Sequence, residues 1–306
     1  MHDKSTSSPK TQCCSSPEVW RKNGAIFKYR GHDIYYRTSG TGPTLLLLHG
    51  FPTASWDWHR IWIQLSNHFQ LIALDFIGYG FSAKPSNYAY STFDQADLVQ
   101  GFLTSLGIKK THILAHDYGD TVVQELLARK EDHPDEGFEI QSVCFLNGGL
   151  FYEAIQPRPI QKLLLSPVGF LLGKLYNKRA FYRSFKAIFG STYMPTNTEL
   201  DHFWKIVTHN HGKAIIYKLI RYLNERDRYR DRWVKPLQST EIPLRFINGT
   251  DDPVSGQRMA LRYKDLIPNP DVVLLKGIGH YPQIEDPDAV VREFITFQNN
   301  QNKNDR

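Results

Sequence analysis

The residues of this chain that could do chemistry begin with Asp117, in the segment LAHDYGD at residues 114–120. An apolar run, Thr111–Ala115, predicts a strand that leads into the segment, and Thr121–Arg129 predicts a helix that leaves it. The small residues two positions to either side of Asp117 suit a tight strand-to-helix turn, which exposes a nucleophile at its apex. The pattern therefore predicts a nucleophile elbow with an aspartate at the nucleophile position.

A carboxylate at that position differs in chemistry from the more usual serine. Attack by Asp117 on a carbonyl carbon would give an unreactive anhydride, whereas attack on an sp3 carbon displaces a leaving group and forms an ester. The elbow thus indicates cleavage of an epoxide or of a carbon–halogen bond rather than of an ester or peptide.

Two later segments could complete a catalytic triad. His280 lies in GIGHYP (residues 277–282), and the acid lies in GTDDPV (residues 249–254), where Asp251 and Asp252 are the alternatives. The order nucleophile, acid, histidine is one of the known chain orders of such triads. The other position for an acid, after the preceding strand, holds Asn147, which cannot titrate.

The segment HGFP (residues 49–52) follows the apolar run Thr44–Leu48 and could bind a developing oxyanion. We expect the backbone N–H groups of Phe51 and Tyr118 to be the two oxyanion donors. His49 is assigned to substrate binding, with no role in proton transfer.

The elements that must position these residues alternate between strand and helix, which indicates a mostly parallel sheet covered on both faces. The predicted strands are a hairpin of Ala25–Arg30 and Asp33–Arg37, then Thr44–Leu48, Leu71–Leu74, Thr111–Ala115, Ile140–Leu146, Pro243–Asn248 and Val272–Leu275. Because the carboxyl ends of parallel strands meet at one edge of a sheet, we expect the four polar segments to converge there.

The alternation stops after Gly149, and the residues from Pro157 to Trp233 carry only helical patterns. These patterns predict a helical lid inserted between two halves of the sheet. The expected organisation is a disordered leader (1–20), an α/β core (21–150 and 237–298), a helical lid (151–236) and a disordered tail (299–306).

The motifs HGFPTASWDW (49–58), ALDFIGYGFSAKP (73–85), AHDYGDTVVQELL (115–127) and HYPQIEDP (280–287) make the chain resemble a known family. It resembles α/β hydrolases of the epoxide hydrolase and haloalkane dehalogenase branch, and is most similar to the mesoderm-specific transcript protein group. The resemblance implies the α/β-hydrolase fold, and we expect no cofactor because the sequence contains no motif for a metal, nucleotide or flavin. The resemblance also favours Asp252 as the acid, since Gly-x-x-Asp-Pro-Val is similar to the acid loop of this superfamily.

The resemblance also bears on the leaving group, which distinguishes the two reactions of this branch. Dehalogenases commonly bind halide through a tryptophan after the nucleophile and an asparagine near the oxyanion loop, where this chain has Tyr118 and Phe51. Tyr222-Leu223-Asn224 resembles the Tyr-x-Asn segment whose tyrosine protonates the leaving oxygen in epoxide hydrolases. We therefore expect epoxide hydrolysis, with Tyr222 as the acid and with Tyr152, Tyr182 and Tyr193 as further substrate-binding candidates.

Two alternatives remain open at this stage. One is a haloalkane dehalogenase, and the other is a hydrolase-like protein that binds a small ligand with little turnover. In all three cases the expected partners are a small apolar organic molecule and, for the enzymes, water. No motif for a metal or nucleotide accompanies the triad residues, and we expect no metal site.

The net charge and the absence of targeting signals bear on the partners and the location of the protein. The net charge is +6, and the segment from Pro157 to Pro236 holds 16 Lys/Arg against 5 Asp/Glu. A solvated basic face is the simplest interpretation, and attraction to an anionic membrane or an acidic partner is the alternative. The most apolar stretch, Leu163–Leu175, predicts a helix that is buried over a pocket. Without a nucleic-acid motif or an apolar leader, we expect a cytoplasmic protein that does not bind nucleic acid.

Overall fold

The computed structural model describes residues 16–304, in which eight strands form a single sheet of order β1-β2-β4-β3-β5-β6-β7-β8. The strands are β1 (Ala25–Tyr29), β2 (His32–Ser39), β3 (Thr44–Leu48), β4 (Gln70–Leu74), β5 (Lys110–His116), β6 (Glu139–Leu146), β7 (Leu244–Gly249) and β8 (Val272–Leu275). β2 runs antiparallel to both of its neighbours, β1 and β4, and β3 to β8 are mutually parallel. The predicted mostly parallel sheet is confirmed.

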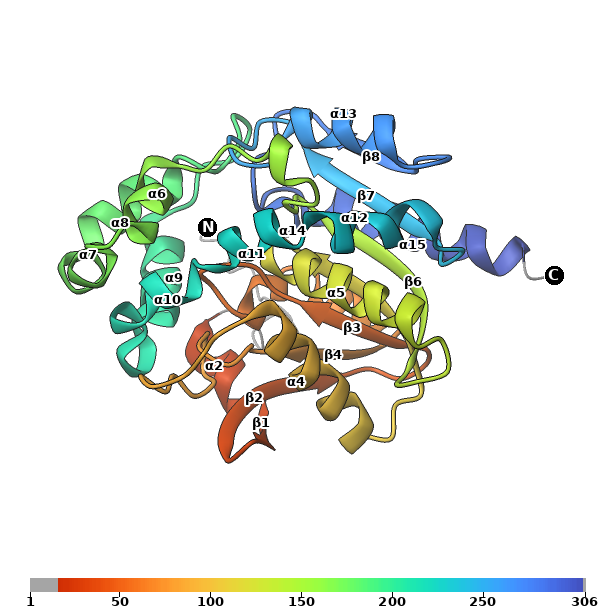
Figure 1. Ribbon diagram of the computed structural model, residues 1–306, viewed down its shortest axis with the longest axis horizontal. Coiled ribbons are helices and arrows are strands. Elements are labelled where there is room, and N and C mark those ends of the chain that lie inside the picture. Colours follow the sequence, from red (N-terminus) through yellow and green to blue (C-terminus); the bar gives the residue numbers. More distant parts are fainter. Residues whose placement is uncertain (1–15, 305–306) are drawn as a thin grey trace, which may run out of the picture.

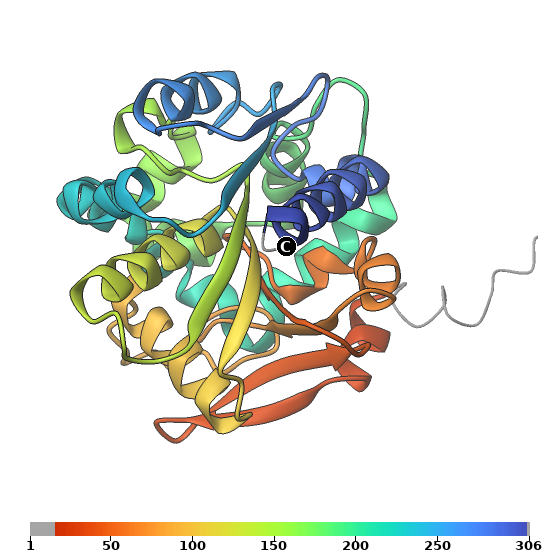
Figure 2. The ribbon, with the colours of Figure 1, turned by 90° about the vertical axis from the view of Figure 1, so that its right-hand side faces the viewer.

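Helices cover both faces of this sheet, as Figure 2 shows. On one face lie α4 (Thr92–Ser105), α5 (Tyr118–Asp132) and α12 (Arg230–Ser239), and on the other α3 (Trp62–Ser66) and α15 (Pro287–Asn304). Double cover explains why the central strands are continuous apolar runs, such as the four consecutive fully buried leucines of β3. Shorter helices complete the core: α2 (Pro17–Lys22), η1 (Ser55–Trp58), η2 (Tyr152–Ala154), α13 (Gln257–Leu266) and α14 (Pro282–Glu285).

The insertion between β6 and β7 is helical. It contains α6 (Pro159–Leu165), α7 (Gly169–Leu175), α8 (Lys178–Lys186), α9 (Asn197–Thr208), η3 (His209–Ala214), α10 (Ile216–Leu219), α11 (Tyr222–Arg228) and α12. Figure 1 places α6 to α10 beyond one end of the sheet, whereas α11 and α12 return across it to α5. The lid therefore has an outlying part and a part that lies on the helix of the elbow.

The ordered structure extends further at both ends than the sequence predicts. Helix α2 begins inside the predicted leader, because the Ser16 hydroxyl accepts a hydrogen bond from the N–H of Val19 and Trp20 is fully buried. Helix α15 continues to Asn304 through most of the predicted tail. Residues 1–15 of the predicted leader lie outside the described residues. Within the described part of the chain, no helix combines the length and apolarity that crossing a membrane requires.

Candidate active site

Asp117 stands at the junction of β5 and α5 in a backbone conformation that side chains rarely adopt, with φ 48° and ψ −102°. The turn also needs the glycine two positions later. A Cβ on Gly119 would lie 2.3 Å from the carbonyl oxygen of Leu48, at the end of the neighbouring strand β3. A strained backbone conformation that its surroundings hold in place is a common property of functional positions.

Three strand ends bring the predicted triad residues together. Nδ1 of His280, after β8, lies 2.8 Å from Oδ2 of Asp252, after β7. Nε2 of His280 lies 3.8 Å from Oδ2 of Asp117, which is an ion-pair rather than a hydrogen-bond distance. All three side chains are buried. The histidine is thus held by one carboxylate and directed at the other.

The structure also distinguishes Asp252 from its neighbour. Oδ2 of Asp252 accepts hydrogen bonds from Asn147 (2.9 Å) and Ser255 (2.7 Å), and its Oδ1 accepts one from the N–H of Val254 (2.8 Å). Asp251 is exposed and bonds Ser191 instead. Asn147, which the sequence showed only to be unable to titrate, therefore orients the acid.

Charges on these buried groups are strongly coupled. Burial lowers the pKa of His280, but the carboxylates of Asp252 and Asp117 outweigh burial and raise this pKa to about 10. Burial works toward a higher pKa at Asp117, yet His280 and Arg226 hold the pKa of this carboxyl below its usual range. The resting site therefore pairs an ionised Asp117 with a protonated imidazole.

The backbone of the HGFP segment contacts the nucleophile directly. The N–H of Phe51 donates a hydrogen bond of 3.1 Å to Oδ2 of Asp117, as expected of an oxyanion donor. Tyr118 starts helix α5, and its ring stacks on that of Tyr79 with centroids 5.7 Å apart. The role of its N–H as the second donor stays a prediction.

Arg226, on lid helix α11, contacts the nucleophile and was not predicted from the sequence. Its Nη2 donates to the main-chain oxygen of Asp117 at 2.8 Å and lies 3.4 Å from Oδ1 of the same residue. Its Nε donates to Thr121 on α5 at 2.7 Å, and its side chain is only 3% exposed. The only signal in the sequence is its position one helical turn after Tyr222, which puts both residues on the same face of a helix.

A cavity of about 80 Å³ lies over Asp117 and His280. Phe51, Pro52 and Val254 line its core side, and the lid contributes Arg158, Ile160, Gln161, Leu164, Tyr176, Phe181, Ser184, Phe185, Ile188 and Ile216. Most of this lining is apolar, and the chemistry of the ligand stays a prediction.

Comparison with known proteins identifies the family. A family model described as the alpha/beta hydrolase fold matches residues 43–287. The chain belongs to this family.

The relatives of this α/β hydrolase refine the assignment. The chain is 39% identical over 305 residues to the mesoderm-specific transcript protein of Mus musculus, covering 95% of this chain and 90% of that protein, so the predicted resemblance is confirmed. It is 36% identical over 286 residues to the putative hydrolase LipZ of Mycobacterium tuberculosis (strain H37Rv), covering 92% and 99%. Haloalkane dehalogenase DbeA from Bradyrhizobium elkani USDA94 superposes with a TM-score of 0.77 at 21% identity, covering 92% and 98%, which shows the shared fold.

Tyr222, the predicted acid of this α/β hydrolase, lies near the nucleophile but not in the cavity. Its ring is 4.6 Å from the ring of Tyr118 and 5.8 Å from that of Phe51, and the guanidinium of Arg226 lies 4.7 Å from its centroid. The tyrosine that lines the cavity is Tyr176, whose hydroxyl is 2.6 Å from that of Ser184. No motif pointed to Tyr176, because tyrosines are frequent throughout the lid.

The remaining substrate-binding candidates lie away from the cavity, which corrects their assignment. Tyr152 is exposed on η2, Tyr182 bonds Asp201, and Tyr193 accepts a hydrogen bond from Arg60 at 2.6 Å. Tyr182 and Tyr193 therefore tie lid segments to their neighbours.

His49 is a structural residue rather than a substrate ligand. Its Nδ1 lies 2.8 Å from the carbonyl oxygen of Gly50, and its Nε2 accepts a 3.1 Å hydrogen bond from the N–H of Phe76. Burial lowers the pKa of His49 to about 3, so the ring is neutral. It fixes the loop that presents the N–H of Phe51.

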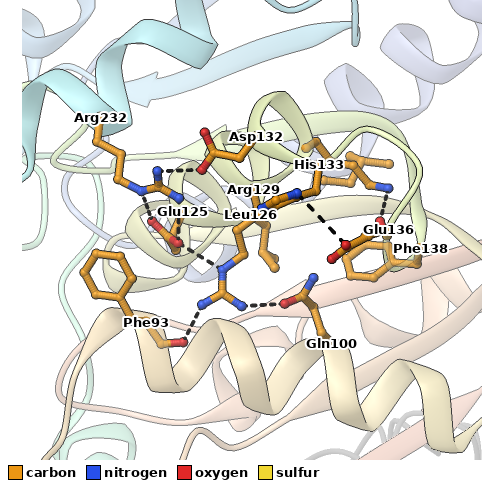
Figure 3. Close-up of a pocket in the computed structure, with 12 residues that line it drawn as sticks. Phe93, Gln100, Glu125, Leu126, Arg129, Asp132, His133, Glu136, Phe138 and Arg232 are labelled. Carbon is orange, nitrogen blue, oxygen red and sulfur yellow. Dashed lines mark hydrogen bonds and ion pairs between the residues drawn. The ribbon is translucent and has the colours of Figure 1, made fainter.

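A larger cavity of about 340 Å³ lies between α4, α5 and α12 and contains no triad residue. Figure 3 shows Glu125 between Arg129 and Arg232, each with its Nε 2.9 Å from a carboxylate oxygen of Glu125. Trp233 donates to Glu125 at the same distance. With its charges paired among themselves, this network fastens lid helix α12 to the helix of the elbow. Among the described residues, no group of His, Cys, Asp or Glu side chains could hold a metal ion.

Proposed function

We propose that this α/β hydrolase opens epoxides to diols through an ester on Asp117. The observation that carries the proposal is the carboxylate of Asp117 at the elbow apex, bonded to the N–H of Phe51 and facing a histidine held by Asp252. A carboxylate there suits displacement at sp3 carbon, and the three groups around it suit hydrolysis of the resulting ester.

In the first step an oxygen of Asp117 attacks an epoxide carbon, and the ring carbon–oxygen bond breaks with its electron pair on oxygen. The alkoxide takes a proton from the phenol of Tyr176, and protonated His280 restores that proton. The esterified Asp117 no longer carries a charge, so one of the two carboxylates that raise the pKa of His280 is lost. His280 thereby becomes a neutral base when the second step needs one.

In the second step His280 removes a proton from water, and the resulting hydroxide attacks the carbonyl carbon of the ester. The N–H of Phe51 stabilises the charge that develops on Oδ2. Collapse of the tetrahedral intermediate breaks the ester carbon–oxygen bond, and the departing alkoxide takes the proton of the hydroxyl group that came from water. This releases the diol and returns the site to ionised Asp117 and protonated His280. Asp252 stays ionised and keeps the imidazole oriented.

The resting charge state favours epoxides over haloalkanes. Ring opening consumes one proton, which the protonated His280 can provide. A halide leaves as an anion and consumes no proton, so a dehalogenase with the same resting site would first have to release that proton to solvent. Among the described residues, the lining of the cavity includes no tryptophan or asparagine, the residue types that commonly bind halide in dehalogenases; the side-chain N–H donors that the lid contributes to it are Arg158 and Gln161.

Trapping of the ester tests the proposal. In His280→Ala the first step remains and the second loses its base, so an aryl epoxide should add its whole mass to the peptide that contains Asp117. A bromoalkane would instead add only its alkyl group, and that product would assign the dehalogenase alternative. If neither compound adds mass to this peptide, the protein does not act through Asp117 and the ligand-binding alternative gains support.

The proton donor is tested by a matched pair of variants. Tyr176→Phe should lower kcat for an epoxide by about 10²-fold or more, because ring opening loses its acid. Tyr222→Phe should have a smaller effect, since Tyr222 does not line the cavity. Single-turnover formation of the ester is the measurement, and a larger loss in Tyr222→Phe would restore Tyr222 as the acid.

The acid is tested by a second pair. Asp252→Asn should lower kcat by about 10³-fold or more, since His280 loses its anionic partner. Asp251→Asn should keep turnover close to the unmodified protein, because Asp251 is exposed and its hydrogen bonds, to Ser191 and Thr250 among others, do not reach His280. Steady-state kinetics with thermal unfolding as the folding control would show the difference, and equal losses in both variants would contradict it.

A further inference from the structure

The outer side of the α6–α7 hairpin is unusually apolar for a protein surface. Of the eleven large hydrophobic side chains exposed among the described residues, five lie between residues 163 and 175: Leu163, Val168, Phe170, Leu171 and Leu175. Leu175 is 72% exposed, the highest value among the eleven. We call these five side chains the apolar tip. Clustered apolar exposure of this kind marks interaction sites, whereas single exposed residues need no explanation.

The hairpin that carries the apolar tip is firmly packed on its inner side. A Cβ on Gly169 would lie 2.0 Å from the carbonyl oxygen of Leu164, and one on Gly173 would lie 2.8 Å from that of Lys213. Ile160 and Leu164 of α6 face the cavity over Asp117. The sequence favoured burial of the whole stretch over a pocket, but the structure buries only one side of it. The other side projects from the molecule, where Figure 1 shows α6 and α7 at the far end from the C-terminus.

Positive charge surrounds the apolar tip. No Asp or Glu occurs between Glu153 and Glu199, while seven Lys and Arg do. On α8, Phe181 and Phe185 face inward, and Arg179 and Arg183 are exposed without an ion pair among the described residues. Lys162 beside the tip is exposed as well.

Asp201 of α9 lies beside this surface and pairs with Lys178, which leaves Arg179 and Arg183 without an ion pair among the described residues. Apolar side chains within a predominantly basic surface fit an anionic lipid surface, since the apolar residues enter the interface and the cations bind headgroups. A second copy of this chain fits less well, because two such faces would bring like charges together. We propose that the face formed by α6, α7 and α8 docks on anionic membranes. Given the proposed function, docking would let a lipophilic epoxide pass from the lipid into the cavity, which α6 and α8 also line.

Vesicle binding by the full chain tests docking directly. Flotation with vesicles of phosphatidylcholine and phosphatidylserine should recover the protein, and phosphatidylcholine alone or high salt should recover much less. Leu171→Asp combined with Leu175→Asp, and separately Arg179→Glu combined with Arg183→Glu, should weaken binding by about tenfold or more. Leu261→Asp is the matched control, since Leu261 is 53% exposed on α13 and should not affect binding.

The outcomes separate docking from catalysis. None of the substituted residues lines the cavity, so each variant should hydrolyse a water-soluble epoxide like the unmodified protein. Absence of binding to either vesicle, or equal loss in Leu261→Asp, would overturn docking and leave the proposed function standing. Binding without turnover of any epoxide would overturn the proposed function and leave docking standing. If the Leu171/Leu175 variant instead abolishes self-association in light scattering, the tip is an interface between copies and docking is overturned.

Discussion

Asp117→Asn should lower kcat for an epoxide by about 10⁴-fold or more. A neutral amide is a far weaker nucleophile than a carboxylate, and the ester through which the proposed reaction passes could not form. The substitution replaces one carboxylate oxygen by an NH2 group, and the backbone of residue 117 is held between β5 and α5. Folding should therefore be retained. Pre-steady-state kinetics would give the size of the loss, and thermal unfolding would check the fold.

The same variant should change the titration of His280. Asp117 is one of the two carboxylates that raise the pKa of His280 to about 10, and asparagine removes its charge. The pKa of His280 should therefore fall, and NMR titration of the imidazole would measure it. A single turnover of the unmodified protein in heavy-oxygen water should also place the label in the Asp117 carboxylate. Turnover without label there would mean that water attacks the substrate directly, with Asp117 acting only through its charge.

The parts of the site that sequence could predict are those fixed by the ends of strands. Asp117, Asp252 and His280 each follow a strand of the parallel sheet, and such strand ends meet at one edge whatever the details of packing. The N–H of Phe51 belongs to the same set, because its loop follows β3, the neighbour of β5. Local sequence patterns were enough to place these groups near each other.

The lid could not be predicted in the same way. Its α-helices and 3₁₀ segments are joined by turns, and which side chain reaches the cavity depends on how each helix is rotated about its axis against its neighbours. Tyr222 lies in a recognisable motif and Tyr176 in none, yet of the two only Tyr176 lines the cavity. Similarly, counting Arg226 among the basic residues of the lid gave no sign that it is buried against Asp117.

Arg226→Met, in the lid, should lower both the stability of the protein and its turnover. The change leaves Asp117 without one of its two cationic neighbours and removes the hydrogen bonds that join α11 to the elbow. Loss of one partner from a buried ion pair should lower the free energy of unfolding by about 3 kcal/mol. Displacement of the nucleophile should lower kcat/KM by roughly 10- to 100-fold. Arg228→Met, on the exposed face of the same helix, is the control and should change neither quantity appreciably.

The pH dependence separates an electrostatic role of Arg226 from a purely structural one. Arg226 helps to hold the pKa of Asp117 down, so its removal raises that pKa, and the acid side of the kcat/KM profile should move to higher pH. Arg226→Lys keeps the charge but not the planar group that reaches Asp117 and Thr121 together. It should therefore retain the pH profile while losing part of the stability. If the acid side of the kcat/KM profile is unchanged in Arg226→Met, then Arg226 only attaches the lid to the core. If the acid side of the profile shifts, then lid helix α11 also controls, through Arg226, the charge of the nucleophile Asp117.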